Sequence, residues 1–129
     1  MKKSVTYEKS FNFAIRAVKV YKWLCDSKKE YVMSKQLLRS GTSIGANVKE
    51  AMNAQSKKDF ISKYSIALKE ASEAEYWIEL LAAGEYFEAR EAKSLLSDIN
   101  EIISLLTASV KTAKEKLKDQ CTMHYALCT

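Results

Sequence analysis

Four polar side chains in the segment LLRSGTSIGANVKEA, residues 37–51, have types and a spacing that could act together. They are Ser40, Ser43, Asn47 and Glu50, separated by three, four and three residues. On a helix, this spacing places two hydroxyls, an amide and a carboxylate in one line at the edge of a buried face. Such a line could bind a ligand, contact a second subunit, or fix helix register inside a bundle. We expect it to be satisfied within its own bundle.

The same segment is rich in residues that weaken helices. Glycine, serine, threonine and asparagine each cost roughly 0.3 to 1 kcal/mol relative to alanine. Beside the polar line runs a small apolar line: Leu37, Gly41, Ile44, Val48 and Ala51. Gly41 and Gly45 lie four residues apart, so a neighbouring helix could approach closely there. We therefore expect the segment to stay helical.

Two other groups of residues have types that could bind a metal ion. Cys121, His124 and Cys128 could supply three zinc ligands, but a structural zinc site needs four, and no second pair with ligand spacing is present. Glu50, Glu70 and Glu73 could form a carboxylate cluster, but the histidines of a di-iron site are missing. No glycine-rich phosphate loop or nucleophile elbow occurs either. The sequence predicts no enzyme, no catalytic residue, no metal and no cofactor.

The positive charge is concentrated in the first half of the chain. The net charge is +5, yet residues 1–63 hold 14 Lys or Arg against 5 Asp or Glu, whereas residues 64–129 hold 7 against 11. On a helical wheel, six of these cations lie on two outward stripes. The first stripe is Lys9, Asn12, Arg16, Lys19 and Trp23, and the second is Lys35, Arg39, Thr42, Ala46 and Lys49. Such stripes could follow the phosphates of RNA or DNA. A solvated lysine-rich face, or complementary packing between copies, explains them as well.

The elements that position these residues are predicted to be four helices. The 129 residues contain no proline and three glycines, which favours long helices with short connections. Apolar residues at helical spacing place the helices at about 8–26, 34–55, 57–83 and 86–118, followed by a lightly ordered tail at 119–129. The prediction is one domain, residues 1–129, folded as an all-α, antiparallel, up-down-up-down four-helix bundle.

The apolar patterns also predict which faces are buried. In the first helix we expect a core stripe of Phe11, Ala14, Val18, Tyr21 and Cys25, broadened by Ile15 and Leu24. The third helix should bury Phe60, Tyr64, Ala67, Ala71, Ala74, Ile78 and Leu81, and the fourth Ala92, Leu95, Ile99, Ile102, Leu106, Ala113 and Leu117. Ser34 and Ser56 are the expected N-caps of the second and third helices, with Asp59 supporting Ser56, and Gly84 should end the third.

Residues 36–81 resemble the four-helix-bundle family of 23S rRNA intervening-sequence proteins. Its first helical motif, S-x-x-S-I-x-x-N-x-x-E-[AG], is matched by Ser40, Ser43, Ile44, Asn47, Glu50 and Ala51. A second helical motif is matched by Phe60, Ile66, Ala67, Ala71 and either Glu73 or Ala74. The match is strong in the middle third of the chain, extends to the flanking helices by pattern only, and leaves out the tail CTMHYALCT.

The resemblance implies architecture more than activity. It implies a homo-oligomeric ring, expected to be a pentamer, in a bacterial protein. Many family members are encoded within insertions in 23S rRNA genes, and a related bundle is an accessory factor of the reverse transcriptase of diversity-generating retroelements. No biochemical activity belongs to the whole family.

Two functions therefore stand beside each other. The first is an assembly or scaffold module that binds copies of itself and a protein partner. The alternative is an accessory protein of a ribonucleoprotein, which binds RNA or DNA by charge through Lys9, Arg16, Lys19, Trp23, Lys35, Arg39 and Lys49. The sequence shows no membrane-spanning run and no secretion signal, so we expect a cytoplasmic location.

Overall fold

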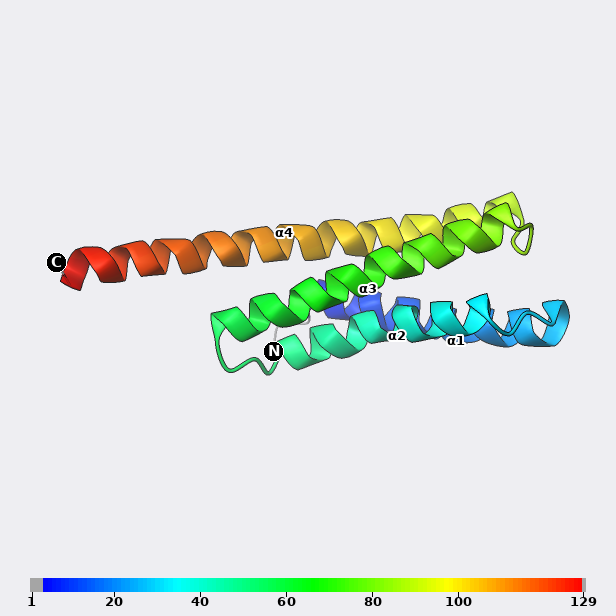
Figure 1. Cartoon of the computed structure of the whole chain (residues 1–129), viewed down its shortest axis with the longest axis horizontal. Coiled ribbons are helices and arrows are strands. Elements are labelled where there is room, and N and C mark those ends of the chain that lie inside the picture. Colours follow the sequence, from blue (N-terminus) through cyan, green and yellow to red (C-terminus); the bar gives the residue numbers. More distant parts are fainter. Residues whose placement is uncertain (1–3, 129) are drawn as a thin grey trace.

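Four helices make up the part of the chain that the structure describes. The structure, a computed structural model, describes the backbone of residues 4–128 and the side chains of residues 4–122 (Figure 1). The helices are α1 (Val5–Lys28), α2 (Met33–Ala51), α3 (Lys57–Ala83) and α4 (Ala89–Cys128). No strand occurs in this range. The predicted all-α four-helix bundle is confirmed.

The helices pack in chain order, and successive helices run in opposite directions. Along α1 and α2, Cys25 lies beside Ser34, whereas Gly45 near the other end of α2 lies beside Ser10. α2 packs against both α1 and α3, and α3 packs along α4 (Figure 1). α1 contacts α2 extensively and α4 much less. The seam between α1 and α4 is therefore the most open one of the bundle.

The core contains the apolar faces that periodicity predicted for α3 and α4. Tyr64, Ala67, Ala71, Ala74, Ile78 and Leu81 of α3 are buried, as are Ala92, Leu95, Ile99, Ile102 and Leu106 of α4. Phe60, Ala113 and Leu117 are only half-buried, because they lie near the end of the bundle where fewer helices surround them. The small side chains of α3 let its neighbours pack closely around it.

The buried face of α1 is not the predicted one. Phe11, Ile15 and Val18 keep 52%, 42% and 37% of their surface exposed. Ala14, Tyr21 and Cys25 are half-buried, and only Leu24 of the expected stripe lies in the core. The helix buries Thr6, Ser10, Phe13, Ala17 and Leu24 instead. Because α1 has apolar residues around most of its circumference, periodicity alone favoured the wrong face.

The contact between α1 and α2 explains this choice of face. Both Gly41 and Gly45 are buried and face α1. A Cβ atom added to Gly41 would lie 2.9 Å from Cβ of Ala17 and 3.3 Å from the Phe13 ring. A Cβ atom on Gly45 would lie 3.6 Å from the backbone of Ser10. Ser10, Phe13 and Ala17 of α1 thus face the glycines of α2. Phe11, Ile15 and Val18 point outward.

The start of α2 uses a different cap from the one predicted. Ser34 is the buried second residue of α2, and its hydroxyl donates to the carbonyl of Glu30 at 2.8 Å. The Glu30 carboxylate accepts hydrogen bonds from the backbone N–H groups of Val32 at 3.0 Å, Met33 at 2.9 Å and Ser34 at 2.7 Å. A carboxylate that accepts three successive N–H groups satisfies more of the helix start than one hydroxyl can.

The bounds of α3 agree with prediction, whereas the other helix ends differ from it by one to ten residues. Ser56 accepts from Asp59 N–H at 3.0 Å and Asp59 accepts from Gln55 N–H at 3.3 Å, so the predicted cap of α3 is confirmed. α1 begins earlier than expected, because Ser4 caps it. α2 ends at Ala51 rather than near residue 55, since the chain needs those residues to reverse toward Ser56. At the end of α3 the left-handed residue is Glu85, with φ 67°, and not Gly84.

The predicted tail is helical. α4 has 40 residues and continues to Cys128, whereas α1 has 24. Figure 1 shows its last turns, in orange and red, running past the start of α3 and the end of α2. No proline or glycine interrupts the sequence after Gly84, so nothing in it stops the helix.

The Glu30 cap predicts an acid-dependent stability. Burial opposes ionisation of Glu30, but the three backbone N–H donors outweigh it, and the pKa of this carboxyl lies below its usual range. A lowered folded pKa stabilises the fold at neutral pH, and this contribution is lost as the pH falls through that pKa. We expect Glu30→Gln to cost about 1 to 2 kcal/mol near pH 7 and less in acid. Urea unfolding of the wild type and the variant, from neutral pH into acid, measures the difference in their free energies of unfolding. A difference that stays constant at all pH values would contradict the cap.

The two glycines of α2 predict substitutions of opposite sign. Gly41→Ala gains about 1 kcal/mol of helix propensity but clashes with Ala17, whose Cβ atom cannot move aside without the backbone. Overpacking of this kind costs about 1 to 3 kcal/mol, so we expect a net loss of stability. Gly45→Ala meets only ordinary contacts and should gain up to about 1 kcal/mol. Denaturant midpoints of the two variants test this; equal shifts would rule out a close approach centred on Gly41.

Candidate functional site

The outer face of α1 carries an uncovered apolar stripe. It consists of Phe11, Ile15 and Val18, which lie three or four residues apart and are all exposed. Val5, 56% exposed, lies at the start of the same helix. Large apolar side chains that line up on a surface usually mark a binding face. We call these three residues, Phe11, Ile15 and Val18, the α1 stripe.

A shallow groove between α1 and α2 borders the α1 stripe. Its volume is about 340 Å³, and it is lined by Tyr7, Phe11, Ala14, Thr42, Gly45, Ala46 and Lys49. The rings of Tyr7 and Phe11 lie 6.1 Å apart. The Lys49 ammonium lies 5.3 Å from the Tyr7 ring centroid, a distance typical of a cation–π contact. Phe11 belongs to both the stripe and the groove, so the two form one continuous apolar surface.

The polar line of α2 bonds mainly to the backbone of its own helix. Ser40 donates to the carbonyl of Gln36 at 2.9 Å, and Ser43 to that of Arg39 at 2.6 Å. The Asn47 amide donates to the Ser43 carbonyl at 2.9 Å. Each bond reaches back four residues, which satisfies the side chain without a partner helix.

Glu50 differs from the rest of the polar line because it reaches another helix. Its carboxylate lies 3.8 Å from Lys63 of α3, and its side chain is 59% exposed. A pair so exposed and so long contributes little to stability. The four residues predicted as one line therefore do not surround a common ligand site.

Several of the cations predicted to form one basic face pair with carboxylates of the same chain. Lys9 lies 2.7 Å from Glu101 and Arg16 lies 2.6 Å from Asp98, so both join α1 to α4. Lys19 and Lys35 are exposed. Trp23 stacks on Phe87 at 6.2 Å between ring centroids, near the turn that leads into α4. The seven residues, which include Arg39 and Lys49, are distributed over different seams and surfaces.

Arg39 has two carboxylate partners on α3. It lies 3.2 Å from Glu70 and forms a short ion pair with Glu73. The hydrogen bond from Arg39 lowers the pKa of the Glu73 carboxyl below its usual range. Arg39 and Glu73 each keep at least a third of their side-chain surface exposed, so screening by water reduces the strength of the pair. The arrangement joins two helices and has the geometry of a structural contact.

The described side chains offer no assembled metal centre. Within residues 4–122, no three His, Cys, Asp or Glu side chains come together as metal ligands. Cys121 is exposed. His124 and Cys128, which complete the Cys–His–Cys pattern, lie outside the described side chains. Glu50 is paired with Lys63, and Glu70 and Glu73 with Arg39.

The sequence patterns missed the α1 stripe as a surface because they assigned its residues to the core. The sequence does hold a signal for the true buried face. Ser10 and Ala17 are small residues two helical turns apart, and they meet Gly45 and Gly41, which are one turn apart on α2. Within residues 4–128, no helix is both long enough and apolar enough to cross a bilayer.

Comparison with known proteins identifies the family. The family model of the 23S rRNA-intervening sequence protein matches residues 2–108. A crystal structure of a protein of unknown function from the S23 ribosomal protein family of Bacteroides thetaiotaomicron VPI-5482 is 54% identical to the chain, with a TM-score of 0.82. The match covers 83% of this chain and 99% of that one. A search among curated proteins found no match. With a family model that spans most of the bundle and a solved relative that shares its fold, the chain belongs to the 23S rRNA-intervening sequence protein family.

Proposed function

We propose that this protein is a non-enzymatic assembly module that binds copies of itself through the outer face of α1. The observation that carries the proposal is the α1 stripe, whose apolar side chains stay 37% to 52% exposed among the residues that the structure describes. Burying a large apolar side chain fully is worth about 1.5 to 3 kcal/mol, and each of these three residues has a third to a half of its surface still to bury.

The shape of this face suits a second copy of the chain. The stripe protrudes from α1, while the groove next to it recedes between α1 and α2. With 24 residues, α1 is about 36 Å long, which is enough for an interface of ordinary size. If the stripe of one copy packs into the groove of the next, the contact is head-to-tail, and such contacts close into rings when the rotation permits. The pentamer that the family resemblance implies is the specific form to test.

The proposal predicts that charges in the α1 stripe abolish assembly. We expect wild-type protein to be oligomeric at micromolar concentration by light scattering and native mass spectrometry. Phe11→Glu with Ile15→Glu should give monomers that keep their helical circular dichroism, because both side chains are already exposed in the single chain. Tyr76→Glu on α3 is the matched control, since Tyr76 is 55% exposed and lies on another helix. It should assemble like the wild type.

Two results would overturn self-association through α1. One is a wild-type protein that is monomeric at micromolar concentration. The other is a double variant that assembles as well as the control. A ring size other than five would correct the stoichiometry while leaving the interface in place.

Charge-driven binding of RNA or DNA is the competing function. Its support is the net charge of +5 and three lysines of the predicted basic face, Lys19, Lys35 and Lys49, which make no ion pair within the described residues. The pairing of Lys9, Arg16 and Arg39 with carboxylates reduces that face, which is why we place assembly first.

The nucleic-acid alternative has its own test. It predicts binding of a short single-stranded RNA by fluorescence anisotropy at low salt, with a logarithmic affinity that falls by about 0.7 per phosphate contact for each tenfold rise in salt. Reversing Lys19, Lys35 and Lys49 to Glu should flatten this slope, while reversing the exposed Lys22, Lys69 and Lys93 should change it much less. Undetectable binding of RNA and DNA at low salt would remove this alternative.

A further inference from the structure

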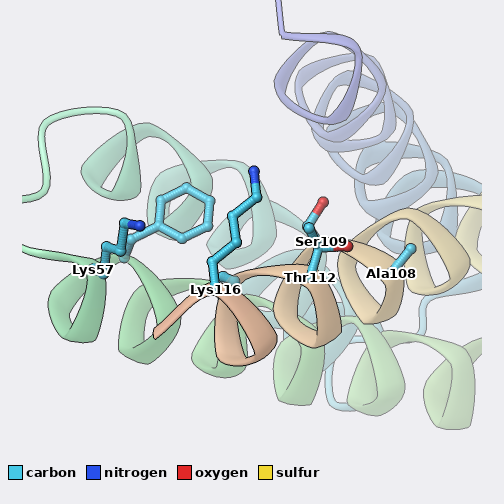
Figure 2. A pocket seen from close by; sticks show the side chains of 7 residues that line it. Lys57, Ala108, Ser109, Thr112 and Lys116 are labelled. Carbon is cyan, nitrogen blue, oxygen red and sulfur yellow. The ribbon is translucent and has the colours of Figure 1, made fainter. Parts of the chain in front are cut away.

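A second groove lies at the other open part of the bundle, where α4 runs past α1. Its volume is about 440 Å³, and it is lined by Lys57 and Phe60 of α3 and by Ala108, Ser109, Thr112, Ala113 and Lys116 of α4. Figure 2 shows Lys57 toward one end of this groove and Ala108 toward the other, with Thr112 and Lys116 between them. We call it the α3–α4 groove. It does not share residues with the α1 stripe or its neighbouring groove.

The α3–α4 groove lies in the position that α1 would occupy if α1 were longer. α1 and α4 run antiparallel, because Arg16 pairs with Asp98 and Lys9, toward the start of α1, pairs with Glu101, further along α4. Continuing in this direction, α1 begins at Val5 while α4 continues through residues 108–116. Beyond the start of α1, no helix within residues 4–128 takes its place beside this part of α4. A single added helix would complete the cross-section of the bundle.

The chemistry of the groove specifies the kind of helix. Phe60, Ala108 and Ala113 give it an apolar lining, whereas Lys57 and Lys116 are exposed cations on opposite walls. Neither lysine forms an ion pair within the described residues. An apolar seam flanked by lysines selects a partner helix that has apolar residues in the seam and carboxylates beside it.

Two other occupants fit less well. The overhanging turns of α4 in a second copy carry Lys111, Lys114, Lys116 and Lys118 against Glu115 and Asp119. Their net positive charge would repel the two lysines of the groove. A nucleic-acid strand would use the cations and the hydroxyls of Ser109 and Thr112, but it would leave the apolar lining largely unused.

We propose that the α3–α4 groove docks an acidic amphipathic helix of a partner protein. The partner helix extends the line of α1, places its apolar side chains on Phe60, Ala108 and Ala113, and its carboxylates beside Lys57 and Lys116. The family model ends at residue 108, so most of the α4 wall lies outside the part of the chain that family members share. The groove therefore gives this chain a partner that the shared bundle does not specify. The proposal is independent of self-association through α1.

The test uses a designed peptide as the probe. A fluorescein-labelled amphipathic helix of about 18 residues, with leucines on one face and glutamates beside them, is titrated with the full-length protein. We expect saturable binding by anisotropy. Lys57→Glu with Lys116→Glu should weaken it by roughly tenfold or more, because two attractions become repulsions. The matched control, Lys22→Glu with Lys93→Glu, has the same net charge but leaves the groove intact and should bind within about twofold of wild type.

A second variant tests the groove without changing charge. Ser109→Trp should fill it and reduce peptide binding, while circular dichroism confirms that the helices remain. Equal losses in the groove pair and the control pair would show attraction to net charge only and would overturn the proposal. Absence of peptide binding would overturn it too. So would tight binding of a short RNA that depends on Lys57 and Lys116 while the peptide does not bind, or a Ser109→Trp variant whose only change is its state of oligomerisation.

The two proposals fail separately. Phe11→Glu with Ile15→Glu should leave peptide binding intact, and Lys57→Glu with Lys116→Glu should leave the oligomeric state unchanged. If the α1 variants also lost the peptide, the probe would bind the α1 face, and the assignment to the α3–α4 groove would be wrong.

Discussion

The close approach of α1 and α2 is the constraint on which the rest of the structure depends. Gly41 has no room for a side chain against Ala17 and Phe13, and Gly45 lies on the backbone of Ser10. Two helices can pack at this distance only if the facing residues are small, so the contact selects the face of α1 that carries Ser10 and Ala17. Once that face is chosen, Phe11, Ile15 and Val18 must point outward. The exposed stripe is therefore a consequence of how the bundle packs, and it leaves the protomer with an apolar surface that association can cover.

The same contact explains how α2 survives its composition. Ser40, Ser43 and Asn47 satisfy their side chains on carbonyls one turn back, so burial at the seam leaves no unpaired polar group among them. Leu37, Ile44 and Val48 are almost fully buried. Their burial stabilises α2 and offsets the low helix propensity of its other residues. The family motif thus encodes a helix with glycines where it contacts α1 and with large buried apolar residues beside them.

Sequence reasoning succeeded where one physical signal dominated and failed where two competed. The faces of α3 and α4 were predictable because each has a single apolar stripe, and the Ser56 cap because Asp59 stands three residues later. The face of α1 was not, because its apolar residues cover most of the helix and only the shape of α2 decides between them. Ser34 was a plausible cap by type, but Glu30 reaches three N–H groups from outside the helix. The α1 stripe and the α3–α4 groove both depend on where neighbouring helices begin and pack, and no local pattern records that.

The uneven charge of the chain also has a structural explanation. The basic first half and the acidic second half become adjacent on folding, since Lys9 and Arg16 of α1 meet carboxylates of α4, and Arg39 of α2 meets two carboxylates of α3. Such exposed pairs are individually weak, so they orient the helices more than they stabilise them. Because this pairing uses cations on the sides of the bundle, the sign of the whole chain says little about its partners. What matters for recognition is where a cation remains without a carboxylate beside an apolar surface. Lys57 and Lys116 meet both conditions on opposite walls of one groove, which α1 is too short to fill. This is why we expect a partner of opposite charge to bind at that end of the bundle.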